Sequence, residues 1–125
     1  GADSAVLVEK DQKAINLIKK NSVATKLNYK TEIILAKTED YLARNQYKFT
    51  QIFLDPPFSL PRETKLSSLK NASHYLTTEG ILLLRYPKTE KYPASVKIKD
   101  RTLSIILQKD YGVSRVNFYQ FKVSL

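Results

Sequence analysis

Short apolar runs alternate with segments of helical pattern along most of this chain, and this alternation limits the possible folds more than any other feature. Four runs have the length of strands buried in a sheet: 5–8, 33–36, 49–54 and 81–84. Between them, apolar residues recur at helical spacing in three segments: 11–27, 38–45 and 62–76. Strands that alternate with helices are joined by right-handed crossovers, which favours a parallel sheet covered by helices.

The last third of the chain departs from this alternation. Gly80 is expected to interrupt the chain before the fourth strand, and the basic segment 88–100 is interpreted as a loop. Segments 103–109 and 115–121 have strand character, and the short link between them predicts an antiparallel hairpin. The pattern therefore predicts an α/β fold with a Rossmann-like sheet and a C-terminal antiparallel hairpin. A length of 125 residues fits a single domain, 1–125.

Charge and residue usage indicate the class of partner. The formal net charge is +9 with lysines spread along the chain. One explanation is a basic face that attracts a phosphate backbone, and the other is a lysine-rich proteome in which basic surfaces mean little. There is no cysteine and one histidine, His74, so we expect no metal site. No apolar run approaches the length of a membrane span, and the first residues lack the pattern of a signal peptide. We therefore expect a cytoplasmic protein that does not act at a membrane, while charge alone leaves nucleic-acid binding open.

Three candidate functional positions follow predicted strands. Ligands of an open parallel sheet bind beyond the carboxyl ends of its strands, where Glu9, Lys37–Thr38 and Asp55 are expected. An acidic residue after a strand of a nucleotide-binding sheet accepts hydrogen bonds from ribose hydroxyls, which is the role predicted for Glu9. In isolation such a glutamate is more often a solvated residue, but Asp55 ends another strand of the same sheet.

The sequence Asp55-Pro56-Pro57-Phe58 is the most specific motif. Two prolines fix φ and contribute no backbone N–H, so a rigid turn must follow the strand. The Asp55 carboxylate and the Pro56 carbonyl could accept both N–H bonds of a base amino group, which turns the nitrogen lone pair toward an electrophilic methyl group. Phe58 could stack on the base, and Asp55 could receive the released proton. The competing structural interpretation is a tight turn beside a core phenylalanine.

These motifs together resemble the RsmD family, the bacterial 16S ribosomal RNA guanine-N2 methyltransferases. The resemblance rests on 6–11, on Ile52 to Phe58, and on a closing hairpin with Tyr111-Gly112 and Phe118-Tyr119-Gln120. It implies S-adenosylmethionine as the cofactor and ribosomal RNA or the small ribosomal subunit as the partner. The Asp-Pro-Pro-Phe motif alone is shared more widely, including by adenine-N6 enzymes.

The resemblance also implies roles for individual residues. Glu9 would bind the cofactor ribose, and the cofactor adenine would lie near Lys37-Thr38. Asp55, Pro56 and Phe58 would bind the target amine, with Asp55 also at the cofactor. Apart from the resemblance, Tyr86 is expected directly after the fourth strand, where it could line the substrate pocket, and Pro57 of the same motif is a further candidate for substrate contact.

One family feature is missing from the sequence. The family has a strand and a glycine-rich loop before this point, whereas the chain contains only three glycines, none in such a loop. We therefore expect that the given chain lacks its N-terminal part, including a central first strand. Two alternatives stay open: an adenine-N6 methyltransferase, and a non-catalytic RNA-binding remnant of a methyltransferase. A dinucleotide-dependent oxidoreductase fragment is a weaker third, which Asp-Pro-Pro-Phe disfavours.

Overall fold

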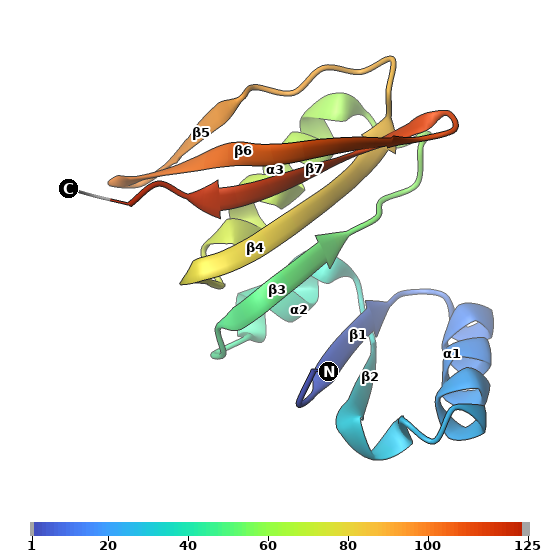
Figure 1. Cartoon of the computed structure of the whole chain (residues 1–125). Helices are drawn as coiled ribbons and strands as arrows, with labels where there is room; N and C mark the ends of the chain where they lie inside the picture. Colours follow the sequence, from blue (N-terminus) through green and yellow to red (C-terminus); the bar gives the residue numbers. More distant parts are fainter. Residues whose placement is uncertain (1, 124–125) are drawn as a thin grey trace. The chain divides into compact units, whose positions relative to one another are not determined.

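The computed structural model describes residues 2–123, which form seven strands, three α-helices and one 3₁₀ turn (Figure 1). In chain order these are β1 (Ala5–Glu9), α1 (Gln12–Ala24), η1 (Asn28–Lys30), β2 (Thr31–Leu35), α2 (Thr38–Arg44), β3 (Phe49–Leu54), α3 (Arg62–Ser73), β4 (Leu76–Pro87), β5 (Ser95–Ile98), β6 (Arg101–Tyr111) and β7 (Ser114–Phe121). The chain divides into two compact units, an N-terminal unit, Gly1–Asn45, and a C-terminal unit, Gln46–Leu125. The single domain expected from the length stays a prediction.

The N-terminal unit is built on a two-stranded parallel sheet. β1 pairs with β2 so that Glu9 lies opposite Leu35, and the Ala36 N–H donates to the Glu9 carbonyl at 3.0 Å. The predicted cap of α1 is confirmed, because the Asp11 side chain accepts a hydrogen bond from the Lys13 N–H at 3.3 Å. The prediction that these strands are buried on both faces is wrong, since Leu35 is 52% exposed.

The C-terminal unit holds a five-stranded sheet in the order β3-β4-β7-β6-β5. Only β3 and β4 are parallel, and the other neighbours are antiparallel. α3 lies against one face of this sheet (Figure 1). The core between them is formed by side chains that are less than 2% exposed, including Leu69, Leu76, Leu82, Leu84 and Leu103.

Three boundaries in this unit differ from the sequence predictions. α3 ends at Ser73, and Leu76 already belongs to β4. Gly80 lies inside β4 rather than before it, at a register shift between β3 and β4; a Cβ atom there would come within 2.6 Å of the Leu76 Cδ1 atom. The predicted loop 88–100 contains β5, a four-residue strand that is too short for its alternation of buried and exposed residues to be recognised in the sequence.

The closing hairpin is confirmed, with longer strands than predicted. β6 and β7 pair from Leu103 and Phe121 to Tyr111 and Ser114, and Gly112 takes a φ of 57° in the turn. A smaller correction concerns α2, where Lys37 is the N-cap and Thr38 is the first helical residue, although Thr38 was the predicted cap.

Candidate functional site

The Asp55–Phe58 turn leaves the sheet where β3 ends at Leu54. The Leu60 N–H donates to the Pro57 carbonyl at 3.1 Å and closes the turn, and α3 begins at Arg62. Because the turn projects from the sheet, the Asp55 side chain is 45% exposed and Phe58 is 38% exposed. Pro57 is exposed as well, so three of the four predicted residues face solvent around this turn.

Arg85 joins Asp55 to Phe58 and was missed by the sequence predictions. Its Nη1 donates to the two Asp55 carboxylate oxygens at 3.4 and 3.3 Å, and its guanidinium carbon lies 5.4 Å from the centre of the Phe58 ring. Arg85 follows Leu84 on β4, the partner of Leu54 on β3. The rule that selected Asp55, a charged residue directly after an apolar run, would also have selected Arg85.

This arrangement combines an acceptor, a cation and an aromatic face. A carboxylate has about four acceptor positions, and the contacts from Arg85 lie at the long end of the hydrogen-bond range. Asp55 therefore keeps the capacity to accept shorter hydrogen bonds from a ligand. An exposed aromatic ring beside it offers a surface on which a planar ring can stack.

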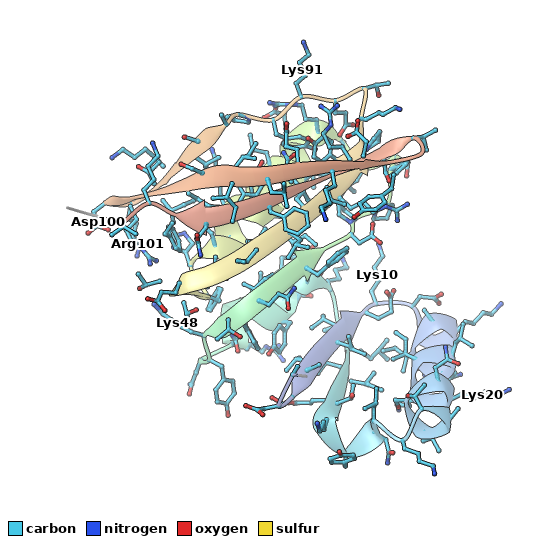
Figure 2. The ribbon with its side chains drawn as sticks, viewed as in Figure 1. Lys10, Lys20, Lys48, Lys91, Asp100 and Arg101 are labelled. Atoms are coloured by element: carbon cyan, nitrogen blue, oxygen red, sulfur yellow. The ribbon has the colours of Figure 1, made fainter. Side chains whose placement is uncertain are left out.

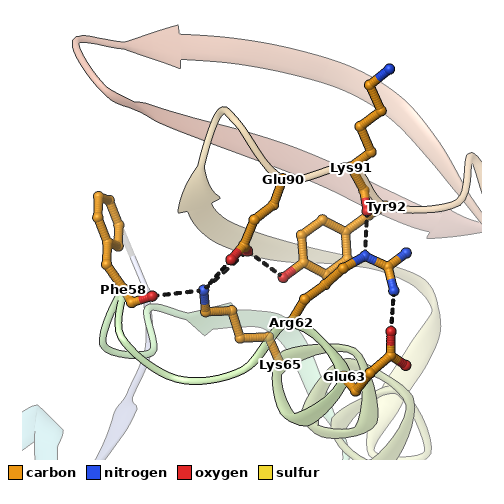
Figure 3. Close-up of polar contacts among 7 residues, drawn as sticks. All are labelled: Phe58, Arg62, Glu63, Lys65, Glu90, Lys91 and Tyr92. Atoms are coloured by element: carbon orange, nitrogen blue, oxygen red, sulfur yellow. Dashed lines mark hydrogen bonds and ion pairs between the residues drawn. The ribbon is translucent and has the colours of Figure 1, made fainter.

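Lys65 holds the other end of the turn. The apolar residues of the predicted helix 62–76 include Leu69 and Ala72, which are buried, and the structure also buries Lys65 completely. Its Nζ donates to the Phe58 carbonyl at 3.2 Å and to Glu90 (Figure 3). The signal that could have found it is its spacing, four residues before Leu69 and seven before Ala72.

The predicted cofactor residues of the N-terminal unit meet at one edge of its sheet. Glu9 ends β1, while Lys37 and Thr38 follow β2, and these parallel strands end side by side. The Glu9 Oε1 atom accepts the N–H groups of Lys10 and Asp11, both at 3.1 Å. Two of the acceptor positions of the carboxylate are thereby used, and Oε2 has room for further donors.

Tyr86 lies inside β4 instead of after it, which corrects its predicted position. The residue is 1% exposed, and its hydroxyl donates to the Asn117 Oδ1 atom at 2.8 Å. Burial raises the pKa of Tyr86 above its usual value. The side chain is thus part of the core between β4 and β7, and in this arrangement it offers no surface to a substrate.

A basic hollow lies at the opposite end of β3 from Asp55. It has a volume of about 400 Å³ and is lined by Lys48, His74, Tyr75, Ile98, Lys99, Asp100 and Arg101. Figure 2 shows Lys48, Asp100 and Arg101 gathered at this end of the C-terminal unit. None of the predicted site residues lines the hollow, so its position does not bear on the chemistry at Asp55.

Within residues 2–123, no group of three or more His, Cys, Asp or Glu side chains is arranged to hold a metal ion. No helix in the same range is long and apolar enough to cross a membrane.

The sequence matches a known protein family and a named bacterial relative. A family model described as Conserved hypothetical protein 95 matches residues 1–120. A Bacillus subtilis (strain 168) protein named "Putative rRNA methyltransferase YlbH" is 24% identical over 123 residues. That match covers 96% of this chain and 65% of the relative, so the chain spans less than two thirds of the relative's length.

Solved structures share the fold. A conserved hypothetical protein of Streptococcus pyogenes matches with a TM-score of 0.84 and 27% identity, over 95% of this chain and 72% of that chain. A structure described as "A putative sam-dependent methyltransferase from Streptococcus mutans" matches with a TM-score of 0.76 and 12% identity, over 95% of this chain and 39% of that chain. The α/β fold predicted from the alternation of strands and helices is therefore confirmed.

Proposed function

The chain belongs to the Conserved hypothetical protein 95 family, the RsmD family that its motifs resemble, and on this premise we propose that it transfers a methyl group from S-adenosylmethionine to the exocyclic N2 amine of a guanine in 16S ribosomal RNA. The name of the Bacillus subtilis protein supports methyl transfer with ribosomal RNA as the substrate. The name of the Streptococcus mutans protein supports methyl transfer with S-adenosylmethionine as the methyl donor. Guanine N2 and the small-subunit RNA are the finer part of the proposal, and they rest on the resemblance to RsmD.

The observation that carries the proposal is the exposed pair of Asp55 and Phe58 on a rigid Pro-Pro turn. Stacked on Phe58, a base would present its amino group at the level of the turn. Asp55 and the Pro56 carbonyl would then accept its two N–H bonds and direct the nitrogen lone pair out of the base plane. As the new N–C bond forms, the nitrogen becomes more acidic, and the Asp55 carboxylate is placed to take the proton.

Glu9 and the segment Lys37-Thr38 are proposed to hold the cofactor. These residues fit the cofactor, because the Glu9 carboxylate can still accept hydrogen bonds from ribose hydroxyls at the edge where β1 and β2 end. The Thr38 N–H lies in the first turn of α2, where helical N–H groups lack a partner within the helix, and it could bind the adenine ring. When bound, S-adenosylmethionine supplies a methyl group already activated by its sulfonium, so the protein contributes mainly positioning.

Arg85 is proposed to orient the Asp55 carboxylate from the side opposite the base. A guanidinium that donates to both oxygens restricts the rotation of the carboxylate, so the acceptors are fixed before the base arrives. Its positive charge also attracts the phosphates of an RNA strand that enters the site.

The product identifies the reaction. Full-length protein would be incubated with S-adenosylmethionine and 16S ribosomal RNA, both naked and within the small subunit, and the digested nucleosides would be separated by mass spectrometry. The expected product is N2-methylguanosine. Formation of N6-methyladenosine would show that the target base is adenine and not guanine. Salt-sensitive RNA binding without any methyl transfer would favour the non-catalytic alternative.

A further inference from the structure

Lys65 is a buried charge with all its donors in use. The residue is 0% exposed, and the three hydrogen bonds of its ammonium go to the Phe58 carbonyl at 3.2 Å and to the two Glu90 oxygens at 3.0 and 3.1 Å. An ammonium has three N–H donors, so this set is complete. Figure 3 shows the ammonium between the turn that carries Phe58 and the loop that carries Glu90.

Stability alone does not explain a lysine at this position. On the same face of α3 lie Leu69, Ala72 and Ser73, a stripe where an apolar side chain is the usual choice. Removing a charge from water costs several kcal/mol, and apolar replacements of buried ion pairs are often as stable or more stable. The lysine supplies something that methionine cannot, a directed charge-assisted hydrogen bond to one backbone carbonyl.

Glu90 is itself held in place, so the ion pair is anchored on both sides. The Tyr92 hydroxyl donates to the Glu90 Oε1 atom at 3.0 Å, and burial together with this bond raises the pKa of Tyr92. The Tyr92 ring packs edge-on against Tyr86, with centroids 4.4 Å apart. Arg62 donates from Nε to the Lys91 carbonyl at 2.6 Å, and this bond fastens the loop between β4 and β5 to α3 (Figure 3).

The carbonyl that Lys65 binds is that of Phe58, the residue whose ring is proposed to stack on the base. Pro56 and Pro57 restrict the backbone before Phe58, and the bond from Lys65 restricts it after Phe58. With both sides restricted, the orientations open to the Phe58 ring and to the Asp55 carboxylate are few.

We propose that Lys65 is a positioning residue for methyl transfer: through its bond to the Phe58 carbonyl it fixes the Asp55–Phe58 turn in the geometry that receives the target base. This inference rests on the proposed function and deepens it. Lys65 contacts neither the base nor the cofactor, and Glu90 acts through Lys65 by holding its ammonium.

The test uses full-length protein with two variants and a matched control. Lys65→Met keeps the apolar stem, and the double variant Lys65→Met/Glu90→Gln also removes the charge that the single change leaves unpaired. Lys70→Met, at an exposed position of the same helix, is the control. Single-turnover methyl transfer, RNA affinity, S-adenosylmethionine affinity, thermal midpoint and amide hydrogen exchange of the turn would be measured for each.

We expect the double variant to lose about 10- to 100-fold in the single-turnover rate, since small displacements of reacting groups cost factors of this size. Both affinities should change less than about threefold at an unchanged thermal midpoint, a split that a general loss of structure would not produce. The amides of 58–60 should exchange faster, and Lys65→Arg should recover part of the rate because it retains a cationic donor.

Two outcomes separate this inference from the proposed function. A folded double variant with a wild-type transfer rate, or with unchanged exchange at 58–60, overturns the role of Lys65 while the proposed function stands. Absence of transfer by the wild-type protein overturns the proposed function, and with it the role of Lys65 in methyl transfer. Hydrogen exchange at 58–60 would still show whether Lys65 holds the turn.

Discussion

The two units of the chain bury the side chains of their strands to different extents. In the N-terminal unit the buried hydrophobic residues among those described are Ile15 and Leu42, and no residue of β1 or β2 is fully buried. In the C-terminal unit β4 alone buries Leu82, Leu83 and Leu84. The turn proposed to bind the base leaves β3, an edge strand that has no fully buried residue itself but pairs with the well-buried β4. The edge proposed to bind the cofactor ends a pair of strands that are both lightly buried.

This difference suggests a division of tasks. A site that orients a reacting amine needs a rigid support, because small displacements are costly in rate. A site at the end of a lightly buried sheet gains order when its ligand binds, so ligand and fold stabilise each other.

The largest effect is expected at Asp55. Asp55→Ala should lower methyl transfer by about 100-fold or more, because it removes both an acceptor for the amine and the proton acceptor. Cofactor affinity should stay within about threefold of wild type, as measured by titration calorimetry. Asp100→Ala, an exposed aspartate at the other end of the unit, is the control, and full activity of Asp55→Ala would remove Asp55 from the mechanism.

The next largest effect is a difference between the two units in the unfolding free energy that is lost when a leucine of a strand is truncated. Leu84→Ala in the C-terminal unit should cost about 2–5 kcal/mol of unfolding free energy, since Leu84 is 0% exposed. Leu35→Ala in the N-terminal unit, where Leu35 is 52% exposed, should cost less than about 1 kcal/mol. Denaturant unfolding measures both, and equal costs would show that the strands are buried alike.

A change at Glu9 should affect cofactor binding and leave RNA binding intact. Glu9→Ala removes the charged acceptor for ribose hydroxyls, and loss of such a bond costs about 1.5–3 kcal/mol, or about 10- to 100-fold in affinity. Glu32→Ala, an exposed change on the neighbouring strand, is the control. The assignment fails if both variants bind S-adenosylmethionine as wild type does.

The smallest effect concerns alkaline pH and the C-terminal unit. Burial and the bond to Glu90 raise the pKa of Tyr92 above the value of 10.0 that an unperturbed tyrosine has. The folded protein therefore keeps this proton where the unfolded chain loses it, so stability is complete below pH 10 and falls as the pH rises beyond it. Tyr92→Phe should flatten this fall in pH-dependent unfolding, whereas Tyr111→Phe at an exposed position should not.

Local patterns predicted the elements of both units but not how deeply each is buried. A run such as Ala5-Val6-Leu7-Val8 encodes a strand, and nothing in it encodes what covers the strand. The runs 5–8 and 81–84 therefore look alike in sequence, although β1 has no fully buried residue and β4 buries Leu82, Leu83 and Leu84. Short-range rules also located Glu9, Lys37, Thr38 and Asp55 at strand ends. They missed β5, whose four residues alternate too briefly to be distinguished from a polar loop.

The remaining site residues depend on contacts distant in sequence. Arg85 is 30 residues from Asp55 and meets it only because β3 and β4 are neighbours. Lys65 and Glu90 are 25 residues apart, and a lysine on an apolar stripe gives no sign of its partner. Tyr86 was placed after a strand because β4 was expected to end at Leu84, whereas it continues to Pro87.

Amide hydrogen exchange of the full-length protein, with and without S-adenosylmethionine, tests the division of tasks most directly. The account predicts that the free protein exchanges faster in β1 and β2 than in β4 and β7, and that the cofactor slows exchange at the edge formed by Glu9 to Asp11 and Lys37-Thr38. The amides of 58–60 should respond to RNA more than to the cofactor. Equal exchange in the two sheets, or cofactor protection that leaves this edge unchanged, would contradict it.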